Sequence, residues 1–238
     1  MPPSRRKGLA ADPPAPAEMP LVTLEEIQQD RQISTFISGA DRVMEGLGFT
    51  EHGFRHANLT GRIAFNLLSR LGFDDRTSNL ACLAGYMHDI GNMVARRDHG
   101  QVGALLVYDV LKERMAMADL SLVMGAVGNH EEPGGEGAGA VAAAVILADK
   151  SDVHRSRVRK SAQIDFDIHD RVNFAAEQSF LRVDSAARTV TLELTIDTDI
   201  SHVMEYFEIF LDRMVMCRRA AERLDCRFKL TINGATLL

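Results

Sequence analysis

The chain has 238 residues, of which 46% are hydrophobic and 25% are charged, and its formal net charge is −6. This composition excludes a wholly disordered or fibrous protein, and the net acidity counts against a broad nucleic-acid-binding face, which needs clustered Lys and Arg. A chain of this length is expected to form one main domain with a small appendage.

The cysteines and the apolar runs bear on the cellular compartment. Cys82, Cys217 and Cys226 are odd in number and form no Cys-x-x-Cys pair, so the sequence predicts neither a disulfide framework nor a thiolate zinc site. The longest apolar run, residues 138–148, is shorter than the ~20 residues that a membrane-spanning helix needs. Residues 1–20 lack the apolar core of a secretory signal and are predicted to be a disordered tail. We therefore expect a cytoplasmic protein with no membrane contact.

Two helices are predicted in the first third of the chain. Thr23 and Glu26 have the spacing of a capping box, and the apolar residues that follow predict a first helix over about 23–46. After a turn rich in glycine, a second helical pattern runs through residues 59–71 and stops at Gly72, a residue typical of helix C-termini.

The third predicted helix leads into a pair of polar residues. Asp74 or Asp75 can cap it, and its apolar stripe runs directly into His88 and Asp89, with Gly91 as its end. The doublet is therefore expected at a buried helix end, where polar groups need partners.

The middle of the chain predicts two more helices, over about 99–116 and 119–130. His99 opens the first of them and His130 closes the second. The glycine-rich residues 133–139 are expected to form a loop.

A sixth helix, over about 138–160, is predicted to lie at the centre of the helical domain. Its first half is rich in Ala and apolar on all sides, which suits close packing. Asp149 interrupts this pattern about midway, and a buried carboxylate is expected to be paired or to coordinate a metal.

From about residue 180 the apolar period changes from about 3.6 to about 2. Residues 180–183 and 189–196 predict a β-hairpin, residues 200–225 an amphipathic helix, and residues 227–232 a third strand. The predicted parts are a tail, a mainly α helical domain and a small C-terminal α+β unit suited to oligomerisation, at residues 1–20, 21–178 and 179–238.

Six residues along the helical domain have side chains that bind transition metals: His56, His88, Asp89, His99, His130 and Asp149. Imidazole and carboxylate suit Zn, Fe, Mn and Ni, and such ligands on different helices can converge inside a bundle. A second doublet, His169 and Asp170, lies among other charged residues and is expected to be solvated.

The order His, His-Asp, Asp, with the segments His88-Asp89-Ile90-Gly91 and Leu147-Ala148-Asp149-Lys150, resembles the HD-domain superfamily of metal-dependent phosphohydrolases. The resemblance covers about residues 30–160. It implies an all-α bundle in which His56, His88, Asp89 and Asp149 bind a first divalent ion, and Asp89 bridges to a second. It also assigns His99 and His130 to the second ion, as in dinuclear branches, and it favours His56 over the nearby His52.

The sequence also departs from the family pattern. Many members continue the His-Asp-Ile-Gly segment with Lys, whereas this chain has Asn92. Substitute cations to test are Arg96, Arg97, Lys150 and Arg155. A single His130 without a following Gly-Tyr-Pro puts hydrolysis of cyclic di-GMP in doubt.

The resemblance implies hydrolysis of a phosphate ester or anhydride, of a nucleotide or another small phosphate, with His88, Asp89, Lys150 and Arg155 as catalytic residues. An alternative is a regulatory module that keeps the metal and binds a nucleotide or a protein. A third is an interaction protein with structural histidines. We expect the protein to form a homodimer and do not expect it to bind nucleic acid.

Overall fold

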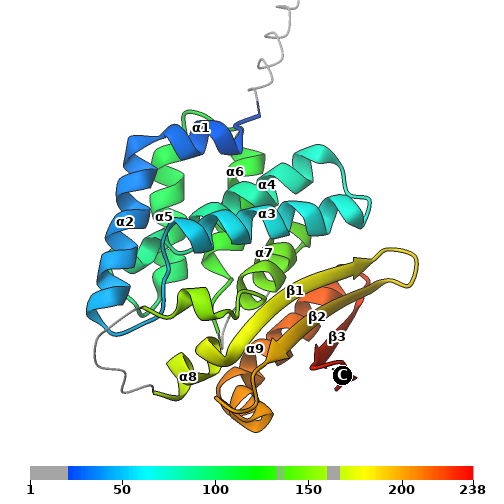
Figure 1. Ribbon diagram of the computed structural model, residues 1–238. Coiled ribbons are helices and arrows are strands. Elements are labelled where there is room, and N and C mark those ends of the chain that lie inside the picture. Colours follow the sequence, from blue (N-terminus) through cyan, green and yellow to red (C-terminus); the bar gives the residue numbers. More distant parts are fainter. Residues whose placement is uncertain (1–20, 133–134, 136, 160–166, 238) are drawn as a thin grey trace, which may run out of the picture.

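The computed structural model describes residues 21–132, 135, 137–159 and 167–237. In this part of the chain a helical domain is followed by a small sheet with one long helix packed on it (Figure 1). The predicted tail, part of the predicted glycine-rich loop and the last residue of the predicted sixth helix lie outside the described residues. Among the described helices, none is both long and apolar enough to cross a membrane.

The predicted first helix is in fact two helices, α1 (Leu24–Gln29) and α2 (Arg31–Gly46). The capping box is confirmed, because the Thr23 hydroxyl accepts from the Glu26 N–H while the Glu26 carboxylate accepts from the Thr23 N–H. The prediction of one helix was wrong at Asp30, whose backbone is extended. Its carboxylate accepts hydrogen bonds from the N–H groups of Gln32 and Ile33, the second and third residues of α2. An internal N-cap of this kind starts a new helix.

Helices α3 (Phe54–Arg70) and α4 (Asp75–Met87) pack against each other along much of their length. Their turn contains Gly72 with a positive φ of 87°, and Asp74 caps α4, as predicted. A Cβ at Gly61 would lie 2.8 Å from the carbonyl oxygen of Cys82, so the two backbones touch. This contact brings the start of α3 beside the end of α4.

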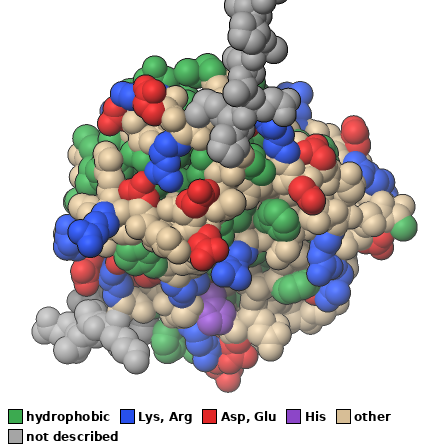
Figure 2. Space-filling model, turned by 90° about the horizontal axis from the view of Figure 1, so that it is seen from above, with side chains coloured by type: hydrophobic (Ala, Val, Ile, Leu, Met, Phe, Trp, Pro, Cys, Tyr) green, Lys and Arg blue, Asp and Glu red, His purple; other side chains and the backbone are tan. Residues whose placement is uncertain are grey.

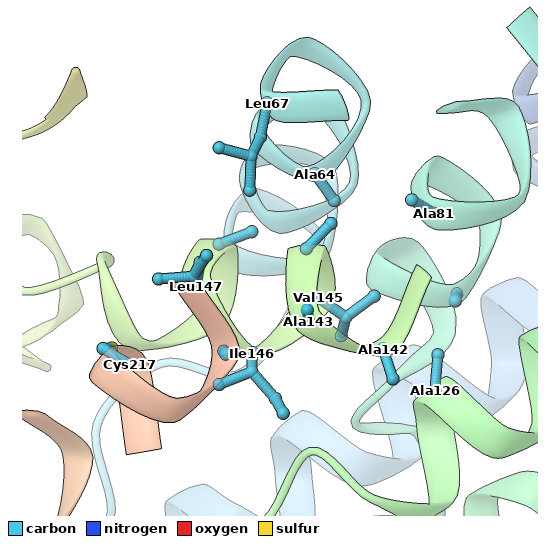
Figure 3. Packing of buried hydrophobic residues seen from close by; sticks show 14 of the residues in the cluster. Ala64, Leu67, Ala81, Ala126, Ala142, Ala143, Val145, Ile146, Leu147 and Cys217 are labelled. Atoms are coloured by element: carbon cyan, nitrogen blue, oxygen red, sulfur yellow. The ribbon is translucent and has the colours of Figure 1, made fainter. Parts of the chain in front are cut away.

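A short 3-10 helix, η1 (Ile90–Met93), follows, and then α5 (His99–Leu111), α6 (Met117–Gly128) and α7 (Ala140–Lys150). Helix α7 is buried at every residue after Ala140, as its predicted central place requires. Figure 3 shows α7 among Ala64 and Leu67 of α3, Ala81 of α4, Ala126 of α6 and Cys217 of α9.

The prediction that this central helix continues to residue 160 was wrong, because α7 ends at Lys150. Beyond it, η2 (Arg155–Arg157) is a single turn, and the basic residues bind the loop before α3 instead of extending the helix. Arg157 donates to the carbonyl oxygen of Glu51, and Arg159 to that of Phe49. Asp149 therefore lies near the end of α7 and not midway.

The C-terminal part begins with α8 (Ile168–Ala175), which the sequence did not predict. The predicted hairpin is present as β1 (Ala176–Asp184) and β2 (Thr189–Ile196), and α9 (Val203–Arg223) joins β2 to the parallel strand β3 (Arg227–Ile232). A short β4 (Ala235–Thr236) completes the sheet in the order β1-β2-β3-β4.

Helix α9 connects the two parts of the molecule. It packs against α7 of the helical domain as well as against the sheet (Figure 1). The predicted boundary at residue 178 falls inside β1. On the face seen in Figure 2, Lys and Arg side chains are interspersed with Asp and Glu and do not gather in one basic field.

Candidate metal centre

The six predicted ligands converge from five helices and their ends. His56 is in the first turn of α3, His88 and Asp89 follow α4, His99 opens α5, His130 follows α6, and Asp149 is near the end of α7. The four histidines are at most 3% exposed.

Four of these residues form a first cluster. The Nε2 atom of His56 lies 3.1 Å from Nε2 of His88 and 3.2 Å from Oδ1 of Asp149. The Nε2 atom of His88 lies 3.1 Å from Oδ2 of Asp89. Atoms from α3, α4 and α7 thus face one point.

The other two histidines form a second cluster. The Nε2 atoms of His99 and His130 are 2.9 Å apart, and they lie 3.2 and 3.7 Å from Oδ1 of Asp89. The two carboxylate oxygens of Asp89 therefore face different clusters. This is the arrangement of a bridging ligand.

The other ring nitrogen of each histidine fixes which tautomer is present. Three of them lie beside the carbonyl oxygen three residues earlier, at 2.7 Å for Gly85, 3.0 Å for Arg96 and 2.6 Å for Val127. In His56 the Nδ1 atom lies 2.7 Å from a carboxylate oxygen of Asp152. Because carbonyl and carboxylate oxygens can only accept, the Nδ1 atoms of His56, His88 and His130 carry the hydrogen, and each of these rings, when neutral, directs the lone pair of Nε2 inward.

These donor atoms fit metal ions. Two lone pairs 2.9 or 3.1 Å apart repel each other unless a cation lies between them. With metal–ligand distances of about 2.0–2.2 Å, two ligands of one ion lie about 3–3.5 Å apart, which matches both clusters. In addition, Oδ2 of Asp89 is buried and accepts no hydrogen bond from any described residue. Each cluster therefore has the donors and spacing for one divalent ion.

The pKa shifts of the candidate ligands show how strongly their charges influence one another. Burial by itself would lower the pKa of His88, but Asp89 and Asp149 raise it to about 10. Against the effect of burial, the neighbouring groups hold the pKa of Asp89 and of Asp149 well below the usual range, with His88 and Lys150 as the largest contributors. Burial lowers the pKa of His130 to about 4, although Asp89 opposes this. The site thus favours carboxylates balanced by positive charge.

Asp152 is a functional residue that the sequence analysis missed. It is buried, it holds the Nδ1–H of His56, and it accepts two hydrogen bonds from Arg55, at 2.8 and 3.2 Å. Burial would raise the pKa of Asp152, but Arg157 and His56 hold it well below its usual range. A carboxylate behind a ligating histidine orients the ring and increases its basicity. Its position three residues after Asp149 was the available signal.

Asn92 stands where many HD-domain sequences carry Lys, and it contacts the bridging ligand. Its side-chain amide donates to Oδ1 of Asp89 at 2.9 Å and to the backbone oxygen of the same residue at 3.1 Å. Asn92 therefore orients Asp89 and offers no cation.

Among the candidate cations, Lys150 lies closest to the clusters. Its ammonium is buried, 2.7 Å from Oδ2 of Asp149 and 3.1 Å from a carboxylate oxygen of Glu132. Glu132 in turn lies 3.4 Å from Nε of Arg213 on α9. One oxygen of Asp149 thus faces the first cluster and the other an ion-pair chain that reaches the C-terminal part.

The other candidate cations have different surroundings. Arg96 lies 2.8 Å from Nδ1 of His99 and pairs with Glu131, whereas Arg97 is 95% exposed. Arg155 pairs with Glu177 of β1 at 3.0 Å. Its catalytic role stays a prediction.

The two alternative histidines lie outside the clusters. His52 packs edge-on against His56, with ring centroids 5.6 Å apart, and its Nδ1 binds the carbonyl oxygen of Thr50. The side chain of His169 in the second doublet is 60% exposed, and its Nδ1 lies 3.8 Å from a carboxylate oxygen of Asp167.

A cavity of about 420 Å³ lies beside the metal centre. Three of its lining residues contact ligands or their partners: His52 packs on His56, Arg96 contacts His99, and Glu132 pairs with Lys150. The opposite wall comes from α8 and α9 and includes Asp170, Asn173 and Arg213. The cavity therefore joins the helical domain to the C-terminal part.

Gly91 determines how closely the two clusters can approach. A Cβ at this position would lie 2.6 Å from the backbone nitrogen of Gly103 and 2.8 Å from the carbonyl carbon of His99. Contacts under 3 Å to backbone cannot be relieved by a side-chain movement. Gly91 thus allows η1 to touch α5 and Asp89 to reach His99.

Comparison with known proteins agrees with this geometry. Residues 51–165 match the family described as the HD domain. An uncharacterized protein of Methanocaldococcus jannaschii is 27% identical over 165 residues, which cover 59% of this chain and 63% of that protein. The chain thus spans less than two thirds of the length of this relative. Residues 51–165 thus match the HD domain, and the His-Asp groups of the described residues are compatible with the metal site of that family.

Proposed function

We propose that this protein is a metal-dependent phosphohydrolase that cleaves an ester or anhydride bond of a nucleotide or another small phosphate. The observation that carries the proposal is the orientation of Asp89, whose two oxygens face two separate histidine clusters. Two divalent ions bridged in this way can activate a water molecule and stabilise the charge of a phosphoryl group.

The residues of the chain have distinct roles in this proposal. His56, His88 and Asp149 hold one ion of the Mn, Fe, Zn or Ni class, and His99 and His130 hold the other. Asp152 and Asn92 orient their ligands from behind. Lys150 keeps Asp149 ionised and adds positive charge beside the site where a phosphate would bind.

The cavity beside the centre supports a small substrate. Its volume of about 420 Å³ lies within the range of about 300–1,000 Å³ that is typical of small-molecule sites. Arg96 and Arg213 line it, and their guanidinium groups can pair with phosphate oxygens.

A second candidate function is a regulatory module that holds metal and nucleotide without turnover. Two observations favour it. Asn92 provides no cation, and Lys150 is already paired with Asp149 and Glu132.

The test combines metal analysis with a substrate screen. Protein purified without chelator is expected to contain two divalent ions per chain and to hydrolyse a phosphate ester or anhydride in the presence of Mn²⁺. Asp89→Ala should lose both the ions and the turnover. Asp109→Ala, which removes an exposed carboxylate on α5, is the matched control and should keep both.

The outcomes separate the hypotheses. Two ions without turnover on any phosphate would favour the regulatory module. A wild-type protein without metal would contradict both functions, and an Asp89→Ala variant with full metal and activity would contradict the bridging role.

A further inference from the structure

A second cavity, of about 430 Å³, lies between helix α3 and strand β1. Its helical wall is one face of α3, formed by Arg55, Leu59, Ile63, Asn66, Leu67 and Arg70. Its other wall is β1, which contributes Ser179, Phe180, Leu181 and Val183. We call this cavity the α3–β1 groove.

Strand β1 is an edge strand. It is the first strand of the sheet and pairs with β2 along its whole length. Among the described residues, no backbone–backbone hydrogen bond joins residues 178–183 to a segment other than β2, and at the start of the strand His154 lies 3.0 Å from the carbonyl oxygen of Glu177. The outer edge of β1 therefore presents unpaired N–H and C=O groups beside the groove, and such a row is a template for another strand.

The sheet face that lines the groove is apolar and incompletely covered. Val190, Leu192 and Leu194 of β2 are at most 3% exposed. Their cross-strand partners, Val183, Leu181 and Ser179, are only partly buried. The buried face of the sheet thus continues past β2 into the groove, where the described residues leave it partly uncovered.

The charges of the groove are one-sided. Arg55 and Arg70 lie near its two ends, fifteen residues apart on α3, which is about 22 Å at about 1.5 Å per residue. Asp152 is the carboxylate that lines it, and it is already bound by Arg55, Arg157 and His56. Arg55 already pairs with Glu51 and Asp152, so the groove suits a ligand with apolar groups along its length and negative charge at the Arg70 end.

We propose that the α3–β1 groove binds an extended peptide segment of a partner protein, which adds a strand to the outer edge of β1. Strand addition supplies main-chain hydrogen bonds, and alternate side chains of the peptide enter the apolar groove. A span of about 22 Å accommodates six or seven extended residues at about 3.3 Å each. The segment has alternating apolar residues and a carboxylate near the end that lies opposite Arg70. The groove shares Asp152 with the metal centre, but peptide binding along β1 does not require the chemistry proposed there.

The direct test uses the full-length protein and labelled seven-residue peptides. The first peptide alternates Val and Thr between two terminal Glu residues, and the second replaces both Glu with Lys. The third carries Pro in place of the central residue, which removes an N–H and prevents strand pairing. Fluorescence anisotropy should show binding of the first peptide, at least tenfold weaker binding of the second, and loss of binding with Pro.

Charge reversal on the protein makes the test specific to the groove. Arg70→Glu should lower the affinity for the Glu-ended peptide at least tenfold and raise the affinity for the Lys-ended peptide. Arg70 is exposed, so the variant is expected to fold. Arg62→Glu is the matched control, because Arg62 is an exposed cation of the same helix that does not line the groove, and it should change neither affinity.

Hydrogen exchange provides an independent readout. With the Glu-ended peptide present, amide exchange in β1 should slow, while exchange in the distant helix α6 should not. No binding of this peptide at about 1 mM, equal affinity for all three peptides, or protection outside α3 and β1 would overturn the proposal. None of these results depends on whether the metal centre hydrolyses a phosphate.

Discussion

The two clusters of the metal centre are held in place by different kinds of contact. In the second cluster, the Nδ1–H groups of His99 and His130 are bound by carbonyl oxygens three residues earlier in the chain. In the first cluster, the Nδ1–H of His56 is bound by Asp152, which is 96 residues away in the sequence. His88 of the first cluster is bound locally as well, by Gly85, so it is His56 that makes this cluster depend on tertiary packing.

The difference indicates where the centre is vulnerable. The first cluster shares its carboxylates with buried cations, since Asp149 pairs with Lys150 and Asp152 with Arg157. A change there should affect both metal binding and folding. A change in the second cluster should affect mainly the second ion.

The largest effect is expected for Asp149→Ala. This variant removes a ligand and leaves the buried Lys150 with one carboxylate partner fewer. Loss of a partner from a buried ion pair costs about 3–5 kcal/mol. We expect loss of the first ion, activity below detection and a lower free energy of unfolding, measured by elemental analysis, phosphate release and denaturant titration. Full stability together with full metal content would contradict this account of the first cluster.

His130→Ala should separate the two clusters. Because the Nε2 atom of His130 faces Asp89 and His99, the bound metal should fall from two ions per chain to one. His202→Ala, which removes an exposed histidine at the start of α9, serves as the control and should retain both ions. Loss of both ions in His130→Ala would show that the clusters are not independent.

Asp152→Asn tests the tertiary support of the first cluster. The amide keeps the shape of the side chain but removes the charge that His56, Arg55 and Arg157 share. Loss of such an outer partner commonly lowers metal affinity about 10–100-fold. Titration with a chromophoric chelator should show this loss for the first ion and an unchanged second ion. An equal loss for both ions would remove the distinction between the clusters.

A pH titration of metal binding should show the smallest and most selective difference. Because the pKa of His88 is raised to about 10, this residue holds a proton at neutral pH that the first ion must displace. The affinity for the first ion should therefore rise about tenfold per pH unit as the pH increases toward about 10. The pKa of His130 is lowered to about 4, so it offers no competing proton above about pH 5. Competition titrations at three pH values would contradict the prediction if both ions had the same slope.

The sequence and the family resemblance together singled out six residues, from His56 to Asp149, that the structure brings close to one another. Their role as metal ligands stays a prediction. The hairpin and α9 were confirmed, since period and turn residues determine them.

The supporting residues could not be predicted from the sequence, because their roles depend on how the chain folds. Asp152 became a partner of His56 only because α7 ends at Lys150 and the loop returns toward α3. The cavity wall from α8 and α9 was missed for the same reason, as α8 is too short to give a clear periodic pattern. Contacts between segments that are distant in the sequence can be identified only once the fold is known.

The close packing at Gly91 has a consequence for the number of ions the centre can hold. A single methyl group there would move α5, and with it His99, away from Asp89, while every ligand stayed in the sequence. The first cluster would keep His56, His88 and Asp149, because none of them is carried by α5. A chain of this family could thus pass from a two-ion to a one-ion centre without changing a ligand. Under the two-ion proposal, the number of bound ions thus depends on the close approach of these two backbones as well as on the histidines.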